Sequence, residues 1–182
     1  MPVEKTPFDF RAPKPLGQDI EKDDVQLHNC GGYDHNFCLP GDGLLHEAAI
    51  LYSPDSGVRL CVSTTMPGVQ LYTANFLGPW TGKGGAAYEK RGAACLETQF
   101  YPNAMACDGF EKPILRGSLC EESRNGSIAK GSLKKIPEKT VFQKTGKGSP
   151  PCAFQKGGFA VKIKRRSLLF FRAAEDALYR SP

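Results

Sequence analysis

Apolar and polar residues alternate with a period of two in several short stretches of the first 100 residues. The clearest is 58–65, in which Val58, Leu60 and Val62 alternate with more polar side chains. A period of two is typical of a strand with one buried face. We predict further strands at 33–39, 46–52, 69–73 and 93–98, which are short segments bounded by turn residues. Gly- and Pro-rich turns separate these short segments, so the pattern favours an all-β sandwich or barrel.

The two ends of the chain lack this pattern. Residues 1–27 show no regular periodicity and are predicted to be irregular chain. Residues 123–158 mix Lys, Gly, Ser and Pro with few large apolar side chains, which predicts a disordered segment. Apolar content returns only at 159–179, where the stretch from Ser167 to Arg180 is compatible with a short helix.

The charge distribution divides the chain near Gly117. Residues 1–117 carry 10 Lys and Arg against 14 Asp and Glu, a net charge of −4, whereas residues 118–182 carry 14 against 5, a net charge of +9; together they give the total of +5. A folded unit rarely changes charge character so sharply. We therefore predict one domain over 1–117 and a basic, low-complexity tail over 118–182.

The basic tail raises the question of a polyanionic partner. The cluster Lys162-Ile163-Lys164-Arg165-Arg166 could attract nucleic acid or an anionic membrane surface. Charge alone, however, gives only salt-sensitive binding without sequence preference. We expect no specific nucleic-acid partner and no membrane partner.

The cysteines and the apolar runs bear on the compartment. Seven cysteines are scattered without any Cys-x-x-Cys pair, so a zinc ribbon or a thioredoxin-like motif is not expected, and no metal site is predicted. No run of 18 apolar residues is present, and the first residues lack the apolar stretch of a signal peptide. Free thiols in a reducing compartment predict a cytoplasmic protein.

Four motifs occur in a characteristic order between residues 6 and 117. They are Tyr33-Asp34-His35-Asn36-Phe37, the stretch from Thr64 to Leu77 with its Pro-Gly-Val-Gln core, the loop Gly82-Lys83-Gly84-Gly85-Ala86-Ala87-Tyr88, and Cys95-Leu96-Glu97-Thr98-Gln99 followed by Pro102-Asn103-Ala104. Together they resemble the C-terminal half of the aldose 1-epimerase (galactose mutarotase) family. The resemblance implies an all-β, mutarotase-like β-sandwich that is incomplete, and it does not extend into the tail.

The resemblance also implies a reaction: the interconversion of α- and β-anomers of an aldohexose such as galactose or glucose, in hexose metabolism. A base removes the proton of the anomeric hydroxyl, an acid protonates the ring oxygen, and the ring opens and closes again. This chemistry needs no cofactor. The expected partner is the sugar itself, bound by a monomer.

The resemblance assigns roles to three residues. Glu97 occupies the general-base position, and Asp34 and Gln70 occupy positions that hold sugar hydroxyls. Each has a plainer alternative: a glutamate on the solvent face of a strand, an aspartate that stabilises a turn, and a polar residue on an exposed face. If Asp34 and Asn36 face the sugar, alternation turns His35 to the opposite face.

The general acid has no counterpart in the sequence. The family's acid histidine, a second substrate histidine and a substrate arginine lie in its N-terminal half, and none of His28, His35 and His46 matches those motifs. The chain thus resembles a truncated, alternatively spliced or mispredicted product of a mutarotase gene. The alternative to an impaired isomerase is a catalytically inactive sugar-binding or non-functional fragment.

Overall fold

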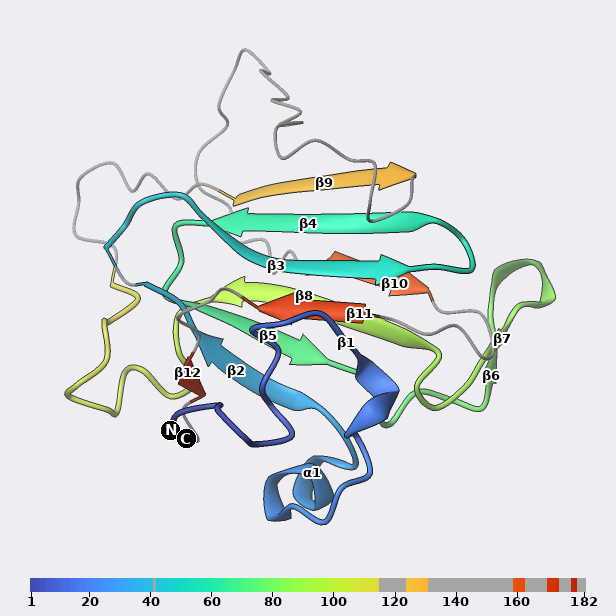
Figure 1. Cartoon of the computed structure of the whole chain (residues 1–182), viewed down its shortest axis with the longest axis horizontal. Coiled ribbons are helices and arrows are strands. Elements are labelled where there is room, and N and C mark those ends of the chain that lie inside the picture. Colours follow the sequence, from blue (N-terminus) through green and yellow to red (C-terminus); the bar gives the residue numbers. More distant parts are fainter. Residues whose placement is uncertain (41, 115–123, 131–158, 163–169, 174–177, 180–182) are drawn as a thin grey trace.

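The computed structural model describes residues 1–40, 42–114, 124–130, 159–162, 170–173 and 178–179 (Figure 1). Strands dominate these residues, which confirms the all-β class. The strands are β1 (Lys14–Pro15), β2 (Asp34–Cys38), β3 (His46–Ser53), β4 (Val58–Thr64), β5 (Gly68–Tyr72), β6 (Trp80–Thr81), β7 (Ala87–Tyr88), β8 (Ala93–Gln99), β9 (Arg124–Lys130), β10 (Phe159–Lys162), β11 (Phe170–Ala173) and β12 (Leu178–Tyr179). The helical elements are α1 (Val25–Cys30) and two 3-10 turns, Leu16–Gln18 and Lys83–Gly85.

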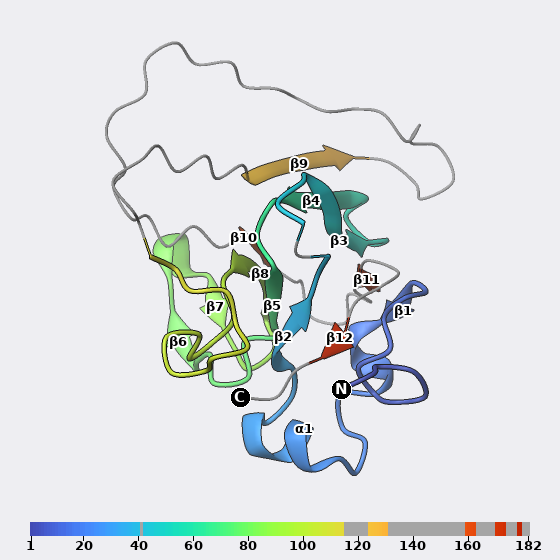
Figure 2. The same cartoon turned by 90° about the vertical axis from the view of Figure 1, so that its left-hand side faces the viewer.

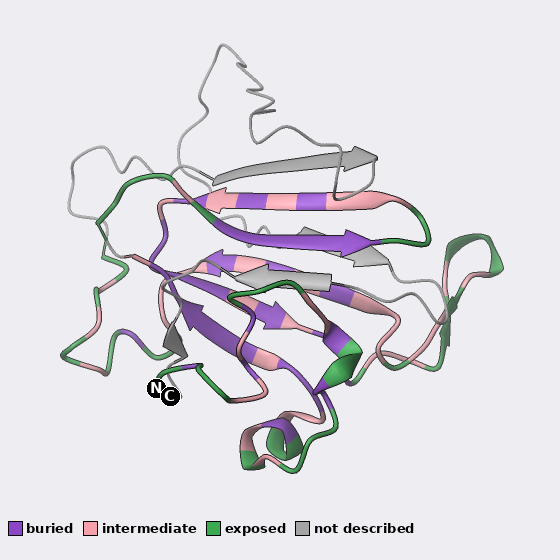
Figure 3. Cartoon of the chain, in the orientation of Figure 1, coloured by how far each residue is buried: buried purple, intermediate pink, exposed green. Residues whose placement is uncertain are grey.

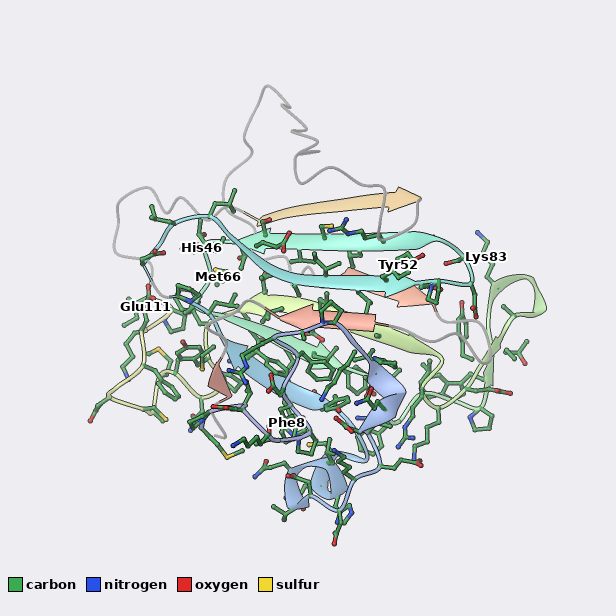
Figure 4. The ribbon with its side chains drawn as sticks, viewed as in Figure 1. Phe8, His46, Tyr52, Met66, Lys83 and Glu111 are labelled. Carbon is green, nitrogen blue, oxygen red and sulfur yellow. The ribbon has the colours of Figure 1, made fainter. Side chains whose placement is uncertain are left out.

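The strands form two antiparallel five-stranded sheets and a small hairpin. One sheet has the order β1-β11-β3-β4-β9 and the other β10-β8-β5-β2-β12, while β6 and β7 pair alone. Figure 2 shows this hairpin beside the second sheet, and Figure 4 shows Lys83 near its tip. Buried residues of both sheets join one apolar cluster, which includes Leu51, Leu60, Leu71 and Leu96. The sheets therefore share a core, as in a sandwich.

The five strands predicted within residues 33–98 are present as β2, β3, β4, β5 and β8, whereas β1, β6 and β7 were not predicted. In β4, Leu60 and Val62 are buried while Arg59 and Cys61 are half-buried. In β8 the same alternation covers the whole strand, and Figure 3 shows it as alternating colours. In β4 and β8 this period of two gives the strand a buried core face and a second, more exposed face.

The irregular N-terminal segment is part of the core rather than a loose end. Phe8 and Phe10 are completely buried, and their rings meet the ring of Tyr33 edge-on at 5.8 and 5.1 Å between centroids. Figure 4 shows Phe8 between this segment and the sheet that contains β2. The segment lacks periodicity because single aromatic side chains, not a regular face, anchor it to the sheet.

The short helix α1 was not predicted from the sequence. Asp24 caps its first turn, since its side chain accepts a hydrogen bond from the backbone N–H of Gln26 at 2.8 Å. Gly31 ends it with φ of 62°, a left-handed conformation that suits glycine. An Asp before an apolar residue and a Gly seven residues after that Asp are the cap signals that this part of the sequence contains.

Four segments of the tail form strands that pair with the two sheets, and one of them, β9, lies within the 123–158 stretch. β9 pairs with β4, β10 with β8, β11 with β3, and β12 with β2. The strand β11 also replaces the short helix considered for residues 167–180. The physical reason is that strand edges offer unpaired N–H and C=O groups, and pairing with them outweighs weak local propensity. The other tail residues, including most of the basic cluster at 162–166, lie outside the described residues.

No helix among the described residues has the length and apolar character needed to cross a membrane.

An ion pair between Lys14 and Asp19, which is largely buried, helps to hold the N-terminal segment against the sheet. Nζ of Lys14 donates to Oδ2 of Asp19 and to the carbonyl of Pro7, both at 2.7 Å, and lies 4.4 Å above the Phe10 ring. The Pro7 carbonyl also accepts from the Tyr33 hydroxyl at 2.9 Å. Burial acts to raise the pKa of Asp19, but the hydrogen bonds from Lys14 and Lys22 outweigh it, and the pKa is lowered below 3.8. This cluster connects the segment to the sheet.

We predict that Lys14→Met strongly destabilises the chain. The substitution leaves the 8% exposed Asp19 side chain with Lys22 as its remaining partner. Breaking a buried ion pair costs about 3 kcal/mol, whereas an exposed pair is worth about 1 kcal/mol or less. Arg11→Met, which removes the more exposed Arg11–Asp9 pair, is the matched control. Urea unfolding followed by far-UV circular dichroism measures both, and equal losses would contradict the anchoring role of Lys14.

Candidate functional site

The register of three neighbouring strands brings Asp34, Gln70 and Glu97 onto one face of a sheet. In the β2–β5 pair, Asn36 lies opposite Gln70, and in the β5–β8 pair, Gln70 lies opposite Glu97. Asp34 precedes Asn36 by two residues and therefore shares its face. All three are half-buried, whereas the alternate positions Leu71 and Leu96 are buried in the core.

Asp34 and Gln70 are directly bonded. Nε2 of Gln70 donates to Oδ1 of Asp34 at 2.8 Å. A carboxylate only accepts hydrogen bonds, so this contact fixes which end of the Gln70 amide faces Asp34. Within the described part of the chain, no group donates a hydrogen bond to the carboxylate of Glu97. Glu97 therefore retains its lone pairs for a proton or for a donor of a ligand.

Burial and the negative charge of this face raise the pKa values of two nearby thiols. Burial raises the pKa of Cys95, and the charges of Glu97 and Asp34 raise it further. Burial followed by the charge of Asp34 also raises the pKa of Cys30. Both thiols are thereby held in the protonated form, which is a poor nucleophile. The chemistry of the face rests on its carboxylates and amides.

The three histidines all lie away from this face. His35 is buried on the core side of β2, where its ring meets that of Phe8 at 4.7 Å and its Nδ1 accepts from the backbone N–H of Asp34 at 2.9 Å. His28 lies on α1 with Asp23 3.7 Å away, and His46 binds Asp42 at 2.7 Å. Burial lowers the pKa of His35, which makes it a neutral structural residue.

Asn75, which follows β5 by three residues, is a structural residue. Its Nδ2 donates to the carbonyls of Cys30 and Tyr33, both at 2.9 Å, and its Oδ1 accepts from Thr73 at 2.7 Å. Its amide group therefore holds the backbone just before β2, and its carbonyl oxygen is bonded to the Thr73 hydroxyl. Gly32 allows this, because a Cβ there would meet the Asn75 carboxamide oxygen at 2.3 Å.

Sequence reasoning did not single out Asn36 and Gln99 as site residues. The register places Asn36 beside Gln70, and Gln99 lies two residues beyond Glu97 on the same face. The available signal was alternation: every second residue from Asp34 and from Glu97 must point to the same side of the sheet. A run of carboxylates and amides on one face suits a polyhydroxyl ligand, because such groups both accept from and donate to hydroxyls.

Among the described residues, no three His, Cys, Asp or Glu side chains are grouped so as to hold a metal ion.

Comparison with known proteins places the chain in a class of enzymes. A sequence model of the family described as aldose 1-epimerase matches residues 1–117, and the chain belongs to this family.

Individual relatives agree. The chain is 46% identical over 116 residues to the galactose mutarotase of Homo sapiens, covering 63% of this chain and 32% of that protein. It is 43% identical over 115 residues to the galactose mutarotase of Bos taurus, again covering 63% and 32%. With the aldose 1-epimerase of Escherichia coli it shares 38% identity over 104 residues, covering 56% and 30%. The chain thus spans about a third of the length of the curated relatives it matches.

The burial of His35 predicts a pH dependence of stability. Its folded pKa lies below the ordinary 6.5, so the unfolded chain binds more protons as the pH falls through that value. The stabilising contribution is present above about pH 6.5 and is lost on acidification, by at most about 1.4 kcal/mol per pH unit. Unfolding free energies between pH 7.5 and 5 measure it. His35→Gln should flatten the curve and His28→Gln should not; identical slopes in both variants would contradict the assignment.

Proposed function

We propose that this polar face binds an aldohexose such as galactose or glucose and takes part in the interconversion of its α- and β-anomers. The observation that carries the proposal is the juxtaposition of Asp34, Gln70 and Glu97 on adjacent strands of one sheet in a member of the aldose 1-epimerase family. The relatives' names supply the substrate class, and the face supplies groups that suit it.

Each residue has a role in this proposal. Glu97, which receives no hydrogen bond from the described residues, accepts the proton of the anomeric hydroxyl and returns it after the ring has opened and closed. Asp34 accepts hydrogen bonds from neighbouring sugar hydroxyls, and Gln70 offers its amide to a further hydroxyl. Charge-assisted bonds to Asp34 orient the sugar so that its anomeric hydroxyl faces Glu97.

No histidine lies on this face to supply the acid step. The three histidines lie elsewhere, so protonation of the ring oxygen falls to water when the chain acts alone. A positioned acid or base typically contributes about 10²- to 10⁴-fold to the rate. We therefore propose a strongly impaired isomerase. Sugar binding without turnover would favour the alternative, a sugar-binding fragment.

The remaining assignments are part of the same proposal. A monomeric, cytoplasmic protein that needs no cofactor fits a small polyol substrate and free thiols. The division into a family domain over 1–117 and a separate basic tail remains a prediction. It has to be reconciled with the four tail strands, which pair with strands of both sheets.

Glu97→Gln tests the base. The substitution keeps the shape of the side chain but removes the lone pair that accepts the anomeric proton. Polarimetry of freshly dissolved α-galactose should show a small acceleration by the 182-residue chain that falls to the spontaneous rate in the variant. Glu47→Gln, an exposed glutamate on β3, is the control and should change nothing. Equal acceleration by Glu97→Gln and the parent would place the base elsewhere, and full turnover by the chain would refute the missing acid.

Asp34→Asn tests sugar binding separately from catalysis. An amide replaces a charged acceptor, and hydrogen bonds to charged groups are worth about 1.5–3 kcal/mol, so galactose affinity should fall about tenfold or more. Glu97→Gln should change affinity far less, because binding rests on the other hydroxyls. A titration of the ¹⁵N-labelled chain with galactose measures both. The same affinity in Asp34→Asn and the parent would contradict its role.

A further inference from the structure

Gln99 joins the two amides of the candidate site. Its Nε2 donates to Oδ1 of Asn36 at 3.3 Å and to Oε1 of Gln70 at 3.4 Å. A carboxamide NH₂ group carries two N–H donors, so each acceptor can have its own proton. Both bonds are long for N–H···O contacts, which makes them weak singly and dependent on their shared donor.

These bonds continue the contact between Gln70 and Asp34. Gln70 accepts from Gln99 through Oε1 and donates to Asp34 through Nε2 at 2.8 Å. The donors therefore run in one direction, from Gln99 through Gln70 to the Asp34 carboxylate. If the Gln70 amide turned over, its oxygen would face the carboxylate and its NH₂ would face that of Gln99. The donor of Gln99 and the carboxylate of Asp34 thus hold the Gln70 amide in one orientation.

Asn36 is fixed in the same way. It is 4% exposed, and its carboxamide lies across Gly68, where a Cβ would meet Oδ1 at 2.6 Å and Nδ2 at 2.9 Å. With Oδ1 occupied by Gln99, the buried Nδ2 has no partner among the described residues. A buried donor without a partner is costly, so its orientation needs a bond that holds it.

We propose that Gln99 is a positioning residue of the sugar site: it fixes the amides of Gln70 and Asn36 so that Gln70 keeps its donor on Asp34, the carboxylate proposed to accept from sugar hydroxyls. This inference rests on the proposed sugar-binding function of the face. It assigns Gln99 no contact with the reacting atoms. Its effect is on the affinity for the sugar through the groups that it orients.

Gln99→Glu is the sharpest test, because it preserves the shape and replaces the donor by an acceptor. A carboxylate at this position accepts from Asn36 and Gln70, which turns both amides over and takes the Gln70 donor away from Asp34. Gln99→Met, of similar length, removes the donor without adding charge and serves if the glutamate variant does not fold. Gln18→Glu, an exposed residue in a 3-10 turn, is the matched control for charge.

Two measurements on the full chain separate the hydrogen-bond relay, which runs from Gln99 through Gln70 to Asp34, from the sugar-binding function. The first is the pair of side-chain amide ¹⁵N–¹H signals of Gln70, assigned by their loss in Gln70→Glu. They should shift in Gln99→Glu and stay unchanged in Gln18→Glu. The second is galactose affinity from titration of the labelled chain, which should fall about tenfold in the Gln99 variants and stay within twofold in the control.

Each result tests a different part of the proposal. Unmoved Gln70 signals in the Gln99 variants would overturn the relay itself. Shifted signals with parental affinity would overturn the positioning role for sugar binding. If the parent chain shows no galactose binding at all, the proposed function and the role of Gln99 in it fail together, while the Gln70 signals still decide whether the relay exists.

Discussion

The antiparallel pairing of β2, β5 and β8 is the constraint on which the candidate site depends. Its register sets Asn36 against Gln70 and Gln70 against Glu97, so residues far apart in the sequence become neighbours on one face. A slip of one residue in any strand would turn its polar side chains into the core and its apolar ones outward. The same hydrogen bonds that stabilise the sheet therefore also determine the geometry of the site.

The two faces of this sheet differ in chemistry: one packs in the core and the other carries polar side chains. The core face carries Leu71, Leu96 and the neutral His35, packed against the N-terminal segment through Phe8. The other face carries carboxylates and amides whose hydrogen bonds run toward Asp34, and it leaves the Glu97 carboxylate without a donor among the described residues. A rigid apolar support beneath a directed polar face is what binding a small polyol requires.

The position of the chain within its family explains why binding and turnover are separate questions. It spans about a third of the length of the relatives it matches, and that third contains the proposed base and the proposed hydroxyl-binding groups. The strands β9 to β12 come from outside the matched residues and pair with both sheets. Backbone pairing demands little of side-chain identity, so segments without family resemblance can complete a sheet.

The sequence by itself determined strands β2, β3, β4, β5 and β8, the family and the three candidate residues. The alternation in β4 of Leu60 and Val62 with Arg59 and Cys61 encodes which side chains face the core. The motifs around Asp34, Gln70 and Glu97 are local enough to be recognised. Only the tertiary structure decided that Phe8 and Phe10 belong to the core, that four tail segments are strands, and that Gln99 contacts Gln70 and Asn36. These features depend on contacts between distant segments, which no local period records.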